Sequence, residues 1–210
     1  MKTLEILKNR RTYYNINKTL PVKEEKLIDF IKETTELVPD AFNMKSQRLT
    51  IFTGKRHDEL WDTIFDIFNG KVKREKIDSF KNGYGTIIFS IDENVVKSKQ
   101  EKYPTYADRI SSWAEQANGM LQISIWEGLR ELGIGASLQH YNPLIDKRVK
   151  EKFGLEDNYK ILAQMVFGGI VEEPEAKEKE TDIDMRVSIV KWICIYGSIK
   201  LDLFLIKDYK

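Results

Sequence analysis

The chain has 210 residues, which is enough for one sizeable domain or for two small ones that share a core. Its 34 lysine and arginine residues balance 33 aspartate and glutamate residues, so the net charge is +1. This balance argues against a general nucleic-acid-binding surface and against a membrane-binding surface. A single cysteine, Cys194, excludes an internal disulfide, and with only two histidines in the chain we expect no metal site.

The N-terminal run MKTLEILKNRR has no long apolar segment, so we expect no secretory signal. No apolar run reaches the roughly 18 residues that are needed to cross a bilayer. We therefore expect a cytoplasmic protein that has neither a membrane nor a nucleic acid as its partner.

A short helix is expected over residues 4–9, with Thr3 as its N-cap. It leads into the run Arg10-Arg11-Thr12-Tyr13-Tyr14. Two guanidinium groups and a hydroxyl are well suited to phosphate oxygens, because they donate forked, charge-assisted hydrogen bonds. The alternative is a solvated basic pair at the end of a helix, where the helix dipole favours cations.

A second helix is expected to open at Pro21, with acidic residues in its first turn and an apolar inner face, and to end at Pro39. The loop over residues 39–47 then leads to a strand over residues 48–53. Within this loop, Asn43 either satisfies the backbone of its own turn or faces a ligand.

The middle of the chain alternates between helix and strand patterns. Residues 57–68 predict an amphipathic helix, with His57 exposed to solvent in its first turn. Residues 71–81 predict a charged surface helix, and residues 83–91 predict a buried strand. Residues 101–109 are aromatic and irregular, and such a segment is suited to a lid beside a pocket.

Residues 118–143 are the stretch around which the rest of the chain is organised. The first half is apolar on nearly every side, which predicts a buried central helix. Gly133 is expected to end this helix, because glycine adopts the left-handed C-cap conformation without steric cost. The small residues that follow allow a flat ligand to lie against the backbone, and the polar tips beyond them can hydrogen-bond its edge. The alternative is a glycine-rich turn between a helix and a strand.

The last third is expected to hold a short helix over residues 146–153 and a strand over residues 159–167. Residues 172–184 form a polar arm, most simply a solvated connection. Residues 187–206 are markedly apolar with partial alternation, so they should pair with a sheet edge or with another subunit. The irregular alternation of helices and strands indicates one α+β unit with an antiparallel or mixed sheet.

Four motifs, taken together, resemble the nitroreductase family of flavoproteins. They occur in the expected order, within residues 4–187, at residues 9–14, 39–43, 83–86 and 133–143. Residues 111–116 and the run GASLQHYNPLID are similar to the fungal and bacterial branch related to the fatty-acid-repression protein. The resemblance implies a homodimer of a three-layer α+β fold, with a central mixed or antiparallel sheet and a long buried central helix.

The same resemblance divides the chain into an FMN-binding domain, residues 1–187, and an atypical apolar C-terminal extension, residues 188–210. This branch normally ends near Arg186-Val187. The extension is then either a strand added to the sheet of the partner subunit or a segment with no counterpart in the family.

FMN would bind at the subunit interface. The resemblance assigns Arg10, Arg11 and Thr12 to its phosphate and ribityl end, and Tyr14 to the pyrimidine edge of the ring. Leu138, Gln139 and His140 would line the isoalloxazine ring near its reactive nitrogen. Because FMN carries the hydride chemistry, we expect no catalytic nucleophile or general base among the side chains.

The other subunit would supply the loop that begins at Pro39, including Ala41, with Asn43 hydrogen-bonded to the cofactor. A basic residue of the late polar arm usually completes the phosphate site in this family. The sequence leaves three candidates open, and these are Lys177, Lys179 and Arg186.

The chain departs from the family at two places in this loop. The family reads Pro-Ser and has a glutamine two residues after the asparagine, whereas this chain has Asp40 and Lys45. We expect Asp40 to face Lys45 or solvent, because it would repel a phosphate. Lys45 is expected to place a positive charge near the ring, where it would stabilise reduced anionic flavin.

The resemblance implies a two-step cycle in which NADH or NADPH reduces the flavin and a nitroaromatic or quinone-like acceptor reoxidises it. Phe42, Tyr103 and Trp113 are the candidates for a wall that stacks on the acceptor, and ordinary core packing is the alternative for Trp113. The alternative function is a flavin-binding regulatory or stress-response module whose turnover is incidental. A third possibility is an interaction protein with no cofactor.

Overall fold

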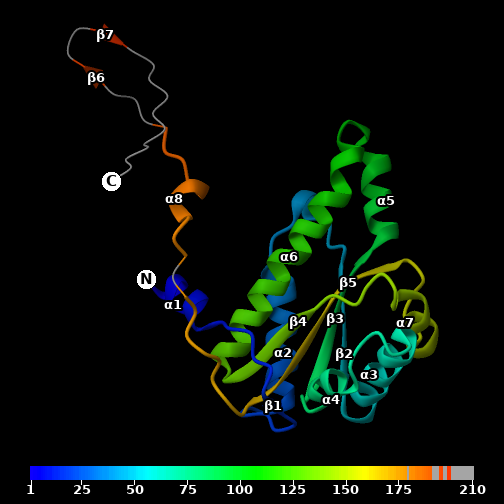
Figure 1. Ribbon diagram of the computed structural model, residues 1–210. Coiled ribbons are helices and arrows are strands. Elements are labelled where there is room, and N and C mark those ends of the chain that lie inside the picture. The colour runs from blue at the N-terminus through cyan, green and yellow to red at the C-terminus, as the bar shows by residue number, and fades with distance from the viewer. Residues whose placement is uncertain (179, 191–193, 196–197, 200–210) are drawn as a thin grey trace. The chain divides into compact units, whose positions relative to one another are not determined.

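The structure is a computed structural model, and it describes residues 1–178, 180–190, 194–195 and 198–199. The chain forms two compact units, Met1–Pro174 and Glu175–Lys210. The first unit contains the sheet and the long helices (Figure 1).

In the described part of the chain, five strands form one sheet in which every pairing is antiparallel. The longest strand, β5, pairs with β3, β4 and β1, and β2 lies on the far side of β3. The residues of β3 are buried along its whole length, which explains why Ile87, Ile88 and Phe89 are apolar in succession rather than alternating with polar residues. The strands are β1 Ile16–Asn17, β2 Gln47–Thr53, β3 Gly85–Asp92, β4 Ile134–Gln139 and β5 Tyr159–Ile170.

Helices cover both faces of this sheet (Figure 1). Alternate residues of β3 show the two layers, because Ile87 and Phe89 pack toward α2 and α6, whereas Ile88 packs toward α3, α4 and α7. The predicted three-layer α+β fold is confirmed. The helices of these layers are α2 Glu24–Leu37, α3 Gly54–Phe68, α4 Arg74–Lys81, α6 Ala107–Glu131 and α7 Asp146–Phe153.

Four shorter helical elements differ from the sequence-based expectations. Helix α1 spans Lys2–Asn9, so Thr3 lies inside it and does not cap it. Helix α5, Glu93–Lys102, was not predicted, although the carboxylate of Asp92 caps it by accepting hydrogen bonds from two backbone N–H groups. Two short 3-10 turns, Ala41–Asn43 and Pro104–Tyr106, complete this region.

The central helix α6 begins at Ala107 rather than at Asn118, so it includes residues expected to be irregular. The predicted buried central helix is confirmed, but a single chain covers only one side of it. Leu121 and Ile125 are fully buried, but Met120 is 42% exposed. The reason is that the sheet and α2 cover one side of the helix and leave the other side open. Gly133, with a φ of +77°, follows the end of the helix as predicted.

The residues after Gly133 do not form a turn. They continue directly into β4, which pairs with β5 from Ile134 opposite Gly169 to Gln139 opposite Gln164. Gly135 lies inside this strand because Tyr13 packs against it, and a Cβ at this position would be 2.9 Å from the Cβ of Tyr13.

The expectation that His57 is exposed is wrong, because its ring is fully buried. Its neighbours in the sequence are charged, but it is spaced i, i+3, i+4 and i+7 with Leu60, Trp61 and Ile64, which form the inner face of α3. Burial lowers the pKa of His57 to about 4.

The second unit contains helix α8, Ile183–Arg186, and two short strands. Strands β6, Cys194–Ile195, and β7, Ser198–Ile199, pair in antiparallel fashion. The expected alternation at residues 201–205 lies outside the described residues, and the domain boundary between residues 187 and 188 stays a prediction. Among the described residues, no helix has the length and apolar character to cross a membrane, and no cluster of metal-ligating side chains is found.

Candidate functional site

The N-terminal run of the predicted phosphate site lies beside β4. The backbone N–H of Tyr13 donates to the carbonyl oxygen of Ala136 at 3.0 Å, and the indole Nε1 of Trp126 donates to the same oxygen at 3.2 Å. Tyr13 is buried, and its Cβ packs against the backbone of Gly135. One carbonyl therefore fastens the N-terminal segment and α6 to the start of β4.

Arg10 is held in an environment suited to an anion. Its Cζ lies 4.3 Å from the ring centroid of Trp126, and its Nε is buried without a hydrogen-bond partner among the described residues. A buried guanidinium N–H without a partner is costly, and an anionic oxygen would satisfy it. Arg11 and Thr12 are half-buried on the same segment, and Tyr14 is exposed. The phosphate-site residues predicted from the N-terminal run therefore share one location.

Sequence reasoning missed a cluster that anchors this segment. Glu173 accepts a hydrogen bond from the hydroxyl of Tyr13 at 2.7 Å and pairs with Arg130 at 3.1 Å. Burial and the bond to Glu173 raise the pKa of Tyr13, while the charge of Arg130 opposes them. The contact joins residues 160 positions apart in the chain, so no local sequence pattern could have indicated it.

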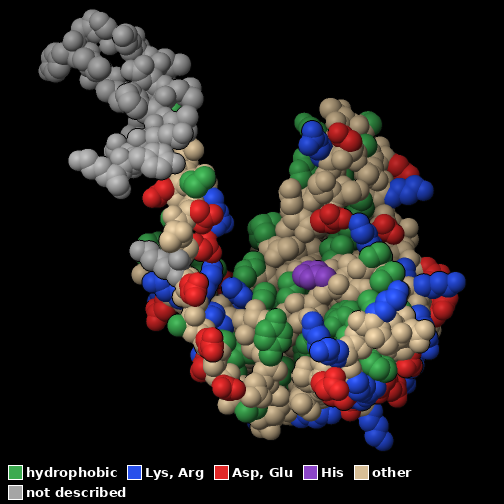
Figure 2. Space-filling view, viewed as in Figure 1, with side chains coloured by type: hydrophobic (Ala, Val, Ile, Leu, Met, Phe, Trp, Pro, Cys, Tyr) green, Lys and Arg blue, Asp and Glu red, His purple; other side chains and the backbone are tan. Residues whose placement is uncertain are grey.

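The predicted ring-binding residues lie at the other end of β4. From Ala136 to His140 the strand advances about 13 Å, at roughly 3.3 Å per residue. Leu138 is half-buried, Gln139 is buried and donates to the hydroxyl of Ser137 at 3.3 Å, and His140 is exposed. Figure 2 shows that the molecular surface is hollowed on the face over β4, between the end of the molecule that holds α5 and the layer that holds α3, α4 and α7.

Asp40 builds the predicted cofactor-binding loop. Its Oδ1 accepts from the backbone N–H of Met44 at 2.6 Å, and its Oδ2 accepts from that of Lys45 at 2.5 Å. Asp40 therefore faces Lys45, as expected, through the backbone. Phe42, Asn43 and Lys45 have φ values of 58°, 47° and 55°. Residues other than glycine seldom adopt this left-handed conformation, and such strain is typical of functional sites.

The three predicted stacking residues are in contact with one another. The rings of Phe42 and Tyr103 stack at 4.5 Å with an angle of 20°, and Trp113 lies 5.7 Å from Phe42. Tyr106, which was not predicted, lies 5.9 Å from Phe42 and 5.8 Å from Trp113. We call these four residues the aromatic cluster. Trp113 also packs against the core that includes Ile110, which fits the core-packing alternative, and its role in stacking on an acceptor stays a prediction.

The aromatic cluster and the N-terminal segment contact opposite ends of α6. Trp113 and Trp126 are 13 positions apart (126 minus 113), which is about 20 Å at 1.5 Å per residue. A single chain therefore holds the two halves of the predicted site apart.

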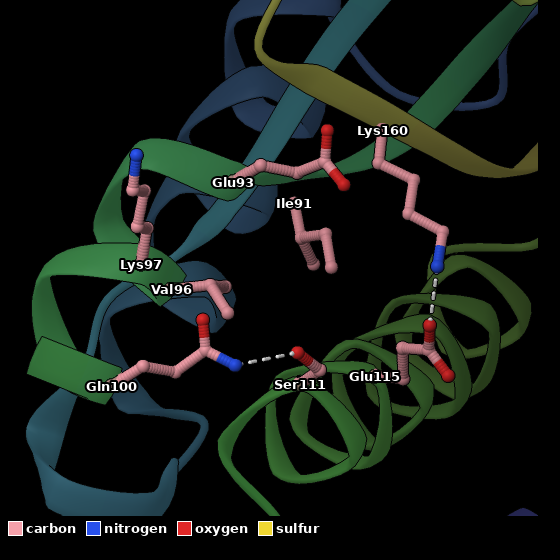
Figure 3. Close-up of a pocket in the computed structure, with 8 residues that line it drawn as sticks. All are labelled: Ile91, Glu93, Val96, Lys97, Gln100, Ser111, Glu115 and Lys160. Carbon is pink, nitrogen blue, oxygen red and sulfur yellow. Dashed lines mark hydrogen bonds and ion pairs between the residues drawn. The ribbon is translucent and has the colours of Figure 1, made fainter. Parts of the chain in front are cut away.

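A separate pocket of about 360 Å³ lies between α5, α6, β3 and β5 (Figure 3). Ile91 and Val96 provide its apolar lining, and the pair between Lys160 and Glu115, at 2.7 Å, borders it. None of the predicted site residues lines it. The remaining lining residues are Glu93, Lys97, Gln100 and Ser111.

Two of the three late basic residues are described, and both lie in the second unit. Lys177 and Arg186 pair with the two carboxylate oxygens of Glu180, at 2.8 Å and 2.6 Å. The hydrogen bond from Lys177 is the main cause that lowers the pKa of Glu180. Lys179 lies outside the described residues, so the choice among the three stays a prediction.

Comparisons with known proteins agree on one family. The nitroreductase family model matches residues 7–169. Nitroreductase FRM2 of Saccharomyces cerevisiae is 30% identical over 179 residues, which cover 83% of this chain and 91% of the yeast protein. Nitroreductase CinD of Lactococcus lactis, solved with chloramphenicol, has a TM-score of 0.84 and 40% identity, covering 90% of this chain and all of that chain.

A protein from Exiguobacterium sibiricum, solved in complex with FMN, shares the fold with a TM-score of 0.67 at 16% identity, over 87% of this chain and 94% of that chain. The family match covers most of the chain, and the similarity to the yeast relative extends beyond the residues that the family model matches. The chain belongs to the nitroreductase family, in a branch similar to yeast FRM2.

Proposed function

We propose that this protein is an FMN-dependent oxidoreductase that uses NADH or NADPH to reduce nitroaromatic or quinone-like acceptors. One observation carries the proposal. The segment that Tyr13 fastens beside the start of β4 carries Arg10, whose Nε is buried without a hydrogen-bond partner among the described residues, and the exposed side chain of His140 lies just past the end of the same strand. This arrangement suits a long ligand with an anionic tail and a flat head.

The residues present fit FMN. Arg10, Arg11 and Thr12 would hold the phosphate and the ribityl end, and Tyr14 would approach the pyrimidine edge. Residues 138–140 would line the isoalloxazine ring. When bound, FMN would supply the redox chemistry: two electrons and a proton taken as a hydride from NAD(P)H, together with one proton from solvent, would convert a nitro group into a nitroso group and water.

A second copy of the chain would complete the site as a homodimer. The separation of about 20 Å along α6 supports this, since a partner could bring its own residues 39–45 to the ring. The exposed side of α6, which includes Met120, offers a surface for that partner. In this arrangement Pro39, Ala41 and Asn43 of each chain contact the cofactor whose phosphate the other chain holds, and Lys45 lies near the ring.

The acceptor would stack on the aromatic cluster. Support comes from CinD, whose structures hold chloramphenicol, nicotinic acid or 4-nitrophenol, all of which carry an aromatic ring. Aromatic side chains favour such ligands because offset stacking adds to the burial of apolar area.

An FMN titration of the wild-type protein and of Arg10→Gln tests the cofactor site. Loss of a charge-assisted hydrogen bond is expected to weaken FMN binding by about tenfold or more. Lys97→Gln, on the surface of α5, is the matched control and should bind FMN as the wild type does. Equal affinity in Arg10→Gln would contradict the assignment of this residue.

Steady turnover separates the enzyme from a binding module. We expect NADH or NADPH to support continuous reduction of a nitroaromatic compound. Tight FMN binding with negligible reduction would favour the regulatory module instead, and absence of FMN binding would favour an interaction protein.

A further inference from the structure

The aromatic cluster presents a preformed surface. Phe42 is 39% exposed and Tyr106 is 47% exposed, and their rings lie 5.9 Å apart. Exposed aromatic rings that lie together mark binding surfaces more often than isolated ones do. The surface is rigid, because Asp40 locks the loop that carries Phe42 and because Trp113 and Tyr103 pack on the core below.

Three lysines lie on the segments that form this surface. The ammonium group of Lys99 donates to the carbonyl oxygen of Phe42 at 3.1 Å, and that of Lys102 lies 5.5 Å from the ring centroid of Tyr103. Lys45 is exposed three residues after Phe42. An ammonium group has three N–H donors, so Lys99 keeps two for a ligand while it holds the loop.

The nearby carboxylates do not cancel this charge at the rings. Both oxygens of Asp40 accept backbone N–H groups of its own loop. Glu101 follows Lys99 by two positions on α5, which places it about 200° around the helix from that lysine. Asp108 lies 3.5 Å from Arg109. The border of the aromatic cluster is therefore richer in positive charge than in negative charge.

We propose that the acceptor site prefers planar aromatic anions, such as nitroaromatic carboxylates, to neutral compounds of the same shape. The aromatic ring of the acceptor stacks on Phe42 and Tyr106, and its anionic group meets the ammonium groups of Lys99 and Lys102. This inference rests on the proposed function, because it concerns the second substrate of the same site.

The test compares 4-nitrobenzoate with 4-nitrobenzamide, which have nearly the same shape and differ in charge. The measured quantity is the ratio of their kcat/KM values with NADH or NADPH as the donor. Differences in the intrinsic reactivity of the two compounds cancel when this ratio is compared between variants.

We expect Lys99→Met and Lys102→Met each to lower the ratio about threefold, mainly through KM, as fits the loss of a partly exposed ion pair. Lys99→Arg keeps the charge and should restore most of the preference, which separates a charge effect from a displaced loop. Lys97→Met is the control, because this lysine lies on α5 but lines the pocket in Figure 3.

The inference would be overturned if the ratio of kcat/KM values is unchanged in both Lys99→Met and Lys102→Met. It would also be overturned if Lys97→Met lowers this ratio as much as they do. Calorimetric titration of the FMN-loaded protein with both compounds, without NADH or NADPH, measures the preference independently of turnover. If the wild type prefers 4-nitrobenzoate in this titration and reduces neither compound, the proposed function fails while the binding preference stands. Equal affinities for the two compounds would refute the preference itself.

Discussion

Protonation of His57 is expected to destabilise the fold strongly in mildly acidic solution. Nε2 of His57 lies 3.0 Å from the backbone carbonyl oxygen of Phe80. A carbonyl oxygen can only accept a hydrogen bond, so Nε2 carries the proton and donates it. Nδ1 then accepts from the hydroxyl of Thr86 at 3.0 Å, and this hydroxyl accepts from Nε1 of Trp61 at 2.9 Å. A second proton on the imidazole would leave the hydroxyl hydrogen of Thr86 without an acceptor and would place a charge in the core.

The size of the effect follows from the two pKa values. The pKa of His57 falls from 6.5 in the unfolded chain to about 4 in the folded protein, mainly through burial. Between pH 4 and pH 6.5, His57 is protonated in the unfolded chain but neutral in the folded protein. Its contribution to the free energy of unfolding is therefore fully present above pH 6.5 and is lost as the pH is lowered toward 4. The difference of about 2.5 pH units corresponds to a loss of about 3 kcal/mol, of which about 2 kcal/mol is reached at pH 5.

Equilibrium urea unfolding at pH 7 and pH 5 measures this loss, with protein concentration held constant. His57→Gln should lose about 2 kcal/mol less than the wild type between the two pH values, since glutamine does not titrate. His140→Gln, which removes the exposed histidine, should retain the wild-type loss. If the wild type and His57→Gln show the same change in the free energy of unfolding, the buried neutral imidazole is not the cause of the loss.

Three further predictions concern the loop and the sheet. Lys45→Gln should lower the midpoint potential of the bound flavin, because a cation near the ring stabilises the reduced anion; potentiometric titration with no downward shift would exclude that role. Asp40→Ala should destabilise the protein by about 2 kcal/mol, measured by urea unfolding, since two backbone N–H groups lose a charged acceptor. Gly168→Ala should lower the free energy of unfolding by about 3 kcal/mol in the same assay, because its Cβ would lie 2.9 Å from the backbone nitrogen of Tyr84. A variant as stable as the wild type would show that the backbone around Gly168 can move to make room.

Residues that end a helix explain which elements could be predicted. The bounds of α2 and α7 follow closely from signals within the segments, such as Pro39 after one helix and Gly154, with a φ of +69°, after the other. Helix α5 was missed because few of its residues are apolar, although its cap at Asp92 was readable. The open side of α6 could not be predicted, because an apolar side chain does not indicate which molecule covers it.

The candidate site was predictable only in part, and for a similar reason. The segment at Arg10 and the strand that ends before His140 each carry a local motif, and their order resembled a family. The links between distant parts carry no such motif. Glu173 at Tyr13 and Tyr106 in the aromatic cluster depend on how the chain folds back on itself, and no pattern within either segment encodes that contact.

The proposed flavin cycle is tested by the visible absorbance spectrum of the purified protein, followed during anaerobic addition of NADH or NADPH and then of a nitroaromatic acceptor. We expect flavin absorption bands that bleach with the nicotinamide donor and return with the acceptor. A protein that stays colourless after incubation with FMN, or whose flavin bands do not respond to either donor, would contradict the proposed function.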